Sequence, residues 1–179
     1  MIKLIVSDMD GTLLDSNSKL PPDFFNTLDK LKAKNIKFVI ASGRSYCTLR
    51  QDFCSNADQM DFISDNGTCI IENGEVTYYN ILDRQDVEQI NDVCGNLESV
   101  NLVLCGRKNA HVVTKSPQSL YEVEKFYKFG FKIADLRNLN DDIYKIGVCD
   151  LKGAATNSYP ILDQKFSDRL SVVLSGELW

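Results

Sequence analysis

The beginning of the chain restricts the fold more than any other segment, because an apolar run there ends abruptly in two aspartates. Residues 4–6 are Leu, Ile and Val, and Asp8 and Asp10 follow shortly afterwards. A short aliphatic run that is broken by Asp and Gly is typical of a strand buried on both faces of a sheet. Alternate residues of an extended chain point to the same side, so we expect Asp8 and Asp10 to project together from the carboxyl end of this strand.

This position suits the binding of a ligand. Open α/β sheets bind ligands beyond the carboxyl ends of their strands. Two carboxylates there can hold a divalent cation, and one of them can attack a phosphorus atom. The alternative is a loop pair or a helix cap, since an isolated Asp-x-Asp is common in both. We favour the chemical interpretation because Gly11 and Thr12 complete the pattern directly after a strand of the buried type.

The first half of the chain alternates strands and helices. We expect helices at about 21–35 and 45–54, strands at 37–41 and 61–64, and a hairpin of strands 68–72 and 75–79 around Asn73-Gly74. Strands that alternate with helices predict a parallel sheet with helical crossovers, which is an α/β fold.

The order of elements changes near residue 81. We expect helices at 84–96, 117–129 and 159–166, and strands at 100–105, 110–114, 142–149 and 170–174. Two consecutive strands after one helix predict an antiparallel α+β module. The expected domains are therefore residues 1–80 and 81–179.

Composition excludes several classes of function. The net charge of −5 argues against a nucleic-acid binder that relies on a basic face, and no apolar stretch reaches the length of a membrane span. The six cysteines are dispersed without a Cys-x-x-Cys pair, which favours reduced thiols. The aspartates also interrupt the N-terminal apolar run too early for a signal peptide. We expect a cytoplasmic protein that binds neither nucleic acid nor membrane.

The segment Asp8-Met9-Asp10-Gly11-Thr12 resembles the first motif of the haloacid dehalogenase superfamily, whose members are mostly phosphatases. The resemblance implies a Rossmannoid parallel core. The order of elements after residue 80 is similar to the α+β cap of the Cof-type phosphatase subfamily. It implies that residues 1–80 are the N-terminal part of the core and that residues 81–179 are the cap.

The same resemblance implies the roles of the first motif. Asp8 would be the nucleophile that forms an aspartyl-phosphate, and Asp10 would be the general acid for the leaving group and the general base for water. Both belong to the Mg²⁺ site of the family, Asp10 also through its backbone carbonyl. Gly11 would let the chain turn sharply beside the phosphate, and Thr12 would help to fix that turn.

Two further loops match the family by position. Ser42-Gly43-Arg44 follows the second strand as the family's second motif does, which implies that the Ser42 hydroxyl and nearby N–H groups bind the phosphoryl group. Arg44 is a candidate for substrate contact, with a structural role as the alternative. Asn66, in Ser64-Asp65-Asn66-Gly67, resembles the Asn-Gly segment of the Cof-type subfamily and could face the substrate or serve as a turn.

The resemblance covers part of a normal family member. The third motif, a Lys, and the fourth, an acidic pair usually preceded by Gly, should follow the cap, but no Gly-Asp dipeptide occurs in this sequence. Asp141-Asp142 and Lys152 do not occupy the required positions. We therefore expect a chain truncated after the cap. In such a chain, residues 4–6 would lie on an exposed apolar sheet edge that invites association.

The favoured function is Mg²⁺-dependent hydrolysis of a small phosphomonoester, such as a sugar phosphate, through an aspartyl-phosphate. A phosphomutase of the same superfamily, which returns the phosphoryl group to its substrate, is one alternative. A catalytically incomplete module that binds phosphate or metal is the other. The expected partners are a small phosphorylated metabolite and, through the uncovered edge, a second copy of the chain.

Overall fold

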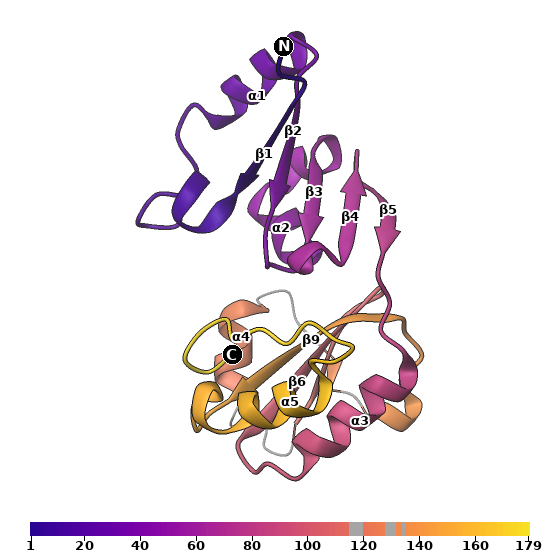
Figure 1. Cartoon of the computed structure of the whole chain (residues 1–179). Coiled ribbons are helices and arrows are strands. Elements are labelled where there is room, and N and C mark those ends of the chain that lie inside the picture. The colour runs from indigo at the N-terminus through magenta and orange to yellow at the C-terminus, as the bar shows by residue number, and fades with distance from the viewer. Residues whose placement is uncertain (115–119, 128–131, 134) are drawn as a thin grey trace. The chain divides into compact units, whose positions relative to one another are not determined.

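The computed structural model describes residues 1–114, 120–127, 132–133 and 135–179, and it contains two compact units, Met1–Asn80 and Ile81–Trp179 (Figure 1). The α/β class that the sequence predicts is confirmed, since parallel strands joined by helices form the sheet of the first unit. Each unit has a hydrophobic core of its own.

The first unit contains a five-stranded sheet in the order β1-β2-β3-β4-β5. Its elements are β1 (Leu4–Asp8), α1 (Phe24–Ala33), β2 (Lys37–Ala41), α2 (Tyr46–Asp52), β3 (Asp61–Ser64), β4 (Cys69–Glu72) and β5 (Glu75–Tyr79). The first three strands are parallel, and β3, β4 and β5 pair antiparallel. The turn between β4 and β5 has positive φ at Asn73 (50°) and Gly74 (79°), which confirms the predicted two-residue hairpin.

Helices α1 and α2 cover the same face of this sheet. The ring of Phe53, directly after α2, lies 5.8 Å from that of Phe24 in α1 and 5.6 Å from that of Phe62 in β3. Leu49 of α2 is fully buried in this cluster. Right-handed crossovers between strands in the order 1-2-3 place both helices on one face. The buried Leu49 and Phe53 hold α2 against the sheet.

The prediction that the first strand is buried on both faces is wrong. Leu4 and Val6 of β1 are 52% and 49% exposed. Strand β1 is an edge strand of the sheet and pairs with β2. Leu4 and Val6 point away from the face that packs against α1 and α2, because Ile5 and Ser7 lie opposite Phe38 and Ile40 of the core. The expected apolar edge is therefore present.

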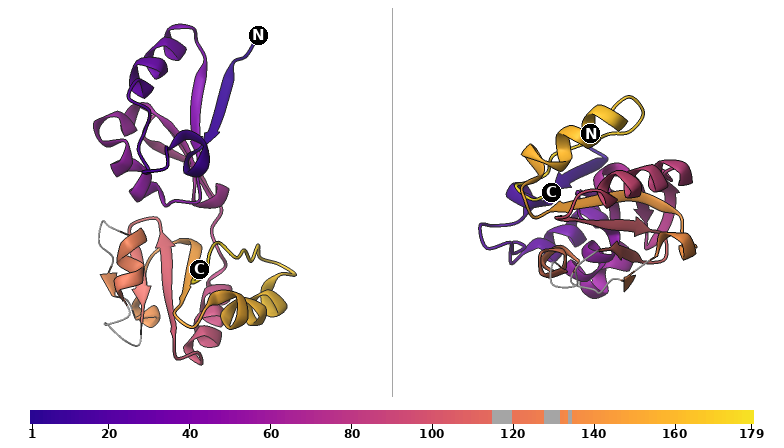
Figure 2. Two further views of the ribbon diagram at one scale, coloured as in Figure 1. Left: turned by 90° about the vertical axis from the view of Figure 1, so that its left-hand side faces the viewer. Right: turned by 90° about the horizontal axis from the view of Figure 1, so that it is seen from below.

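The second unit contains a four-stranded sheet in the order β8-β7-β6-β9, flanked by helices. Its elements are α3 (Arg84–Gly95), β6 (Val100–Gly106), β7 (Ala110–Val113), α4 (Leu120–Phe126), β8 (Lys132–Ile133), β9 (Ile143–Asp150) and α5 (Ser158–Phe166). Figure 2 shows α4 on the face of the sheet opposite to α3 and α5. Strand β6, in the middle, is buried along its whole length.

Short irregular helical segments connect several of these elements. They are Met9–Leu13, Cys54–Gln59, Asp65–Gly67, Leu136–Asn138 and Ala154–Thr156. Of the predicted helix at 117–129, residues 117–119 and 128–129 lie outside the described residues. Among the described helices, none has the length and apolar character that crossing a bilayer requires.

The strand predicted at 170–174 is not formed, although these residues are described. Val173 and Leu174 are 61% and 42% exposed. The chain beyond them returns to the end of β9, where Leu178 O accepts the N–H of Asp150 at 2.7 Å and Glu177 O accepts that of Ala154 at 2.9 Å. An apolar pattern makes a strand only when a neighbouring backbone is available for pairing. The two-residue strand β8 was not predicted from the sequence.

A buried carboxylate organises the region between β9 and α5. Asp150 accepts hydrogen bonds from the Ser99 hydroxyl at 2.9 Å, the Asn157 amide at 2.9 Å, and the N–H groups of Lys152 and Ser158, both at 3.0 Å. Burial raises the pKa of Asp150, but these hydrogen bonds outweigh burial, and the pKa is lowered overall. The ionised carboxylate therefore stabilises this unit.

We predict that Asp150→Asn lowers the free energy of unfolding by about 1–3 kcal/mol at neutral pH, because buried donors lose their acceptor. The pKa of Asp150 in the folded state is lowered, so its stabilisation is complete above the unfolded pKa of about 3.9. It is lost as the pH falls through the folded pKa. In urea unfolding, the difference in unfolding free energy between parent and variant should therefore be constant near neutral pH. It should shrink as the pH falls below about 4.

The control for this comparison is Asp168→Asn, which alters a carboxylate that is 75% exposed. It should change the unfolding free energy little at any pH. A gap between the parent and Asp150→Asn that stays constant down to about pH 2 would contradict the role of the ionised carboxylate.

We predict that the chain associates through β1 and that Val6→Lys reduces this association, because a charge on an exposed edge strand opposes pairing with another chain. Light scattering over a range of concentrations measures the mass of both proteins. Thr77→Lys, on the exposed strand β5 at the other end of the sheet, is the control and should leave association unchanged. A parent that stays monomeric at every concentration contradicts the prediction.

Candidate active site

The first loop of the site follows β1 and contains a tight turn. Asp10 (φ −76°, ψ 118°) and Gly11 (φ 76°, ψ 2°) have the angles of a type II turn, and Leu14 donates its N–H to Met9 O at 2.9 Å. Met9 is buried, whereas Asp8 and Asp10 on either side of it are exposed. Both carboxylates thus reach the surface, and Thr12 lies exposed within the turn. That Asp8 and Asp10 project to the same side stays a prediction.

The second loop begins at Ser42, beside the first loop. Asp8 lies opposite Ala41 in the parallel pairing of β1 with β2, so both strands end at the same edge of the sheet. Ser42 is 8% exposed, and its backbone N–H donates to Ile63 O at 2.9 Å. Its hydroxyl oxygen accepts the N–H of Arg44 at 3.2 Å, which leaves the hydroxyl hydrogen available to a ligand.

The third loop closes over the second. Asp65, Asn66 and Gly67 have φ values of 53°, 60° and 90°, a run of left-handed residues that is strained outside glycine. The N–H of Asn66 donates to Ser42 O at 3.3 Å. A Cβ atom at Gly43 would lie 2.6 Å from the amide oxygen of Asn66. The structure therefore brings Ser42, Gly43 and Asn66 together, and a side chain at 43 would displace the Asn66 amide.

Asp65 is a structural residue of the site that sequence reasoning missed. It is fully buried, and its carboxylate accepts the N–H of Tyr46 at 3.2 Å, at the beginning of α2. Its own N–H donates to Arg44 O at 3.0 Å. These bonds tie the third loop to the second. The sequence signal was weak, because Asp before Asn-Gly is also an ordinary turn pattern.

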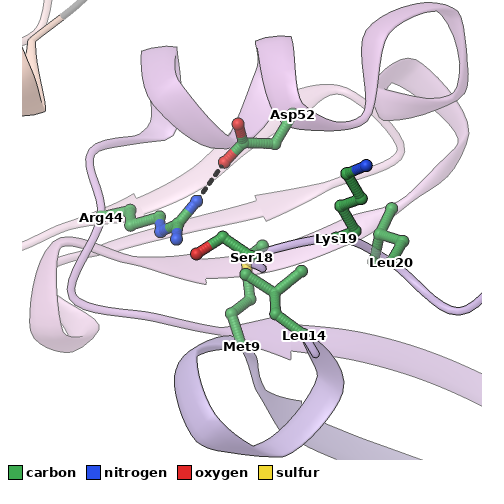
Figure 3. A pocket seen from close by; sticks show the side chains of 7 residues that line it. All are labelled: Met9, Leu14, Ser18, Lys19, Leu20, Arg44 and Asp52. Carbon is green, nitrogen blue, oxygen red and sulfur yellow. Dashed lines mark hydrogen bonds and ion pairs between the residues drawn. The ribbon is translucent and has the colours of Figure 1, made fainter. Parts of the chain in front are cut away.

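Arg44 has two carboxylate partners. Its Nη2 and Nε donate to the two oxygens of Asp10 at 2.6 and 3.2 Å. Its Nη1 donates to Asp52 at 2.7 Å, as Figure 3 shows. Burial lowers the pKa of the guanidinium, but the hydrogen bonds to Asp10 and Asp52 raise it overall, so the charge is permanent. Both interpretations of Arg44, contact with substrate and a structural role, stay predictions.

A cavity of about 190 Å³ lies beside this ion pair (Figure 3). Its lining consists of Met9, Leu14, Ser18, Lys19, Leu20, Arg44 and Asp52. Met9, Leu14 and Leu20 supply its apolar lining, Ser18 is polar, and Arg44, Asp52 and Lys19 carry charge. A small polar group in this cavity would lie next to Arg44, the residue that binds Asp10.

Asp8 and the loop at Asp10 could hold a divalent cation if waters and a substrate phosphate supplied its other ligands. In the part of the chain that the structure describes, no donor bonds to the Asp8 carboxylate, whereas that of Asp10 is held by Arg44. The described residues contain no group of three or more His, Cys, Asp or Glu that could hold a metal. Mg²⁺ commonly uses one or two carboxylates with waters and substrate phosphate, so Asp8 and the Asp10 loop suit it.

Comparison with known proteins identifies the family. The profile of the haloacid dehalogenase-like hydrolases matches residues 5–178, and the chain belongs to this family. It is 28% identical over 149 residues to the 5-amino-6-(5-phospho-D-ribitylamino)uracil phosphatase YbjI of Escherichia coli (strain K12), covering 82% of this chain and 55% of that protein. It is 33% identical over 100 residues to a phosphoglycolate phosphatase of Sulfolobus acidocaldarius, covering 55% of this chain and 38% of that protein.

The fold has counterparts among solved structures. SMU.1108c from Streptococcus mutans UA159 superposes with a TM-score of 0.80 at 25% identity, covering 98% of this chain and 68% of that one. The chain spans about half the length of YbjI and less of the phosphoglycolate phosphatase. The predicted membership of the haloacid dehalogenase superfamily is confirmed.

We predict that Gly11→Ala lowers the free energy of unfolding of the first unit by about 1 kcal/mol, because a Cβ is disfavoured at φ 76°. Urea unfolding measures the change. Gly95→Ala is the control, since φ there is not positive and a Cβ would meet nothing within 4 Å. Equal stability of Gly11→Ala and its parent would mean that the turn tolerates another conformation.

Proposed function

We propose that the protein is a Mg²⁺-dependent phosphomonoester hydrolase that acts on a small phosphorylated metabolite, such as a sugar phosphate, through an aspartyl-phosphate. The observation that carries the proposal is the meeting of three loops at one sheet edge, where the open carboxylate of Asp8 lies beside the loop that begins at Ser42. Relatives that are named phosphatases support it.

In the proposed reaction, a carboxylate oxygen of Asp8 attacks the phosphorus atom as the bond to the leaving-group oxygen breaks. Asp10 donates its proton to that oxygen. It then takes a proton from the water that attacks the aspartyl-phosphate, which releases inorganic phosphate and restores Asp8. A bound Mg²⁺ would neutralise charge on the phosphoryl oxygens.

The neighbouring residues would bind the substrate. The Ser42 hydroxyl and the N–H groups of the loop at Gly43 would donate to the phosphoryl oxygens, and the turn at Thr12 would shape the other side. Asn66 would face the substrate beside Gly43. Arg44 would hold Asp10 and supply positive charge near the leaving group.

The proposed roles of the two units follow the family's division of labour. The first unit, residues 1–80, would be the Rossmannoid core that carries the chemistry. The second unit, residues 81–179, would be a cap that excludes water and selects the substrate. All six cysteines are free thiols, which supports a cytoplasmic location. The exposed β1 supports association of two copies.

The test is release of inorganic phosphate from a panel of phosphosugars, with Mg²⁺ and with EDTA. We expect release with Mg²⁺ and its loss with EDTA. Conversion of one phosphosugar into its isomer without net release would support a phosphomutase instead. Binding of phosphate or Mg²⁺ by calorimetry without turnover would reduce the protein to a binding module.

We predict that Asp8→Asn lowers kcat by about 10⁴-fold or more, because an amide of nearly the same shape is not a nucleophile. The measurement is phosphate release by parent and variant under identical conditions. Asp29→Asn, an exposed position on α1, is the matched control and should retain full activity. Turnover of Asp8→Asn within tenfold of the parent would reject Asp8 as the nucleophile.

A further inference from the structure

Each nitrogen of the Arg44 guanidinium donates a hydrogen bond to a carboxylate. Nε and Nη2 engage the two oxygens of Asp10, and Nη1 engages one oxygen of Asp52. The planar fork of Arg can bind two carboxylates in one plane in this way, which the ammonium of Lys cannot do. The position of the Asp10 carboxylate therefore depends on how Arg44 is oriented.

The elements on the two sides of Arg44 differ in how firmly they are held. Asp52 is the last residue of α2, whose Leu49 is fully buried and whose beginning is capped by Ser45, which accepts the N–H of Thr48 at 3.3 Å. Asp10, in contrast, lies on an exposed turn, and its side chain is 61% exposed. The fixed partner is thus Asp52.

We infer that Asp52 is a positioning residue, which holds Arg44 in the orientation that places the carboxylate of Asp10 for proton transfer. None of the motifs that resemble the family contains it. The inference deepens the proposed function and rests on it, because Asp10 needs a fixed position only if it transfers a proton. Asp52 acts through Arg44 and has no contact of its own with Asp10 among the described residues.

The energetics separate this role from a structural one. The side chains of Arg44 and Asp52 are 27% and 34% exposed, and partly exposed ion pairs contribute little to stability. A displacement of about 1 Å, however, can cost on the order of 10²-fold in rate when it misplaces a catalytic group. Loss of Asp52 should therefore affect turnover far more than folding.

The chain offers a control ion pair that also involves a residue of α2. Arg50 and Asp58 form an ion pair at 3.1 Å with the same spacing in sequence as Arg44 and Asp52, and their side chains are 59% and 62% exposed. This pair contacts none of the proposed catalytic residues. Asp58→Ala thus removes the same type of carboxylate without disturbing Asp10.

The experiment compares Asp52→Ala, Asp52→Asn and Asp58→Ala in phosphate release and in urea unfolding. We expect Asp52→Ala to lower kcat about tenfold with KM within twofold and an unchanged urea midpoint. Asp52→Asn keeps an acceptor oxygen for Nη1, so it should retain kcat within about threefold. Asp58→Ala should match the parent.

Three results would overturn the inference. An unchanged kcat in Asp52→Ala would mean that Arg44 needs no support. A rise in KM at constant kcat would assign Asp52 to substrate binding instead. A fall in Asp52→Asn as large as that in Asp52→Ala would assign the effect to charge, not to the hydrogen bond.

A second readout does not depend on turnover. In protein labelled with ¹³C and ¹⁵N, the Nε–Hε signal of Arg44, assigned with Arg44→Lys, should shift in Asp52→Ala. The signal of the Asp10 carboxylate carbon should shift as well. Both should stay unchanged in Asp58→Ala. Unchanged signals in Asp52→Ala overturn the positioning role. If Asp52→Ala shifts these signals but the parent protein releases no phosphate, the arrangement of Asp52, Arg44 and Asp10 is supported and the proposed function is rejected.

Discussion

The parallel pairing of β1 with β2 is the constraint on which the rest of the site depends. With Asp8 opposite Ala41, the loops that begin at Asp8 and Ser42 leave the sheet at one edge. Pairing of β2 with β3 then brings the third loop to the same edge, where Asn66 bonds to Ser42. Three segments that are far apart in sequence thus meet without any long-range loop, because parallel strands present all their carboxyl ends together.

The sequence was sufficient to predict those elements whose conformation depends on residues adjacent in the chain. The strand Lys37–Ala41 is a β-branched and aromatic run between turn residues, and it forms as predicted. Asn73-Gly74 defines a hairpin because both residues accept positive φ. The resemblance to the family assigned Ser42, Gly43 and Asn66 to one site, and the structure brings these residues together.

Features that depend on contacts between residues far apart in the chain could not be predicted from the sequence. The ion pair between Arg44 and Asp10 joins residues 34 positions apart, and no local pattern indicates it. The exposure of Val6 depends on which face of the sheet the helices cover, which the composition of β1 does not reveal. The absence of a strand at 170–174 has the same origin, since pairing depends on the backbone that lies alongside.

The close approach of Gly43 to Asn66 makes the two positions a single unit in any redesign of the protein. A methyl group at 43 would lie 2.6 Å from the amide oxygen of Asn66, so the amide would have to rotate away. The reverse is also true: a side chain at 66 without that oxygen would leave room for alanine at 43. A redesign of this loop should therefore vary the two positions together, because a side chain at 43 displaces the amide at 66.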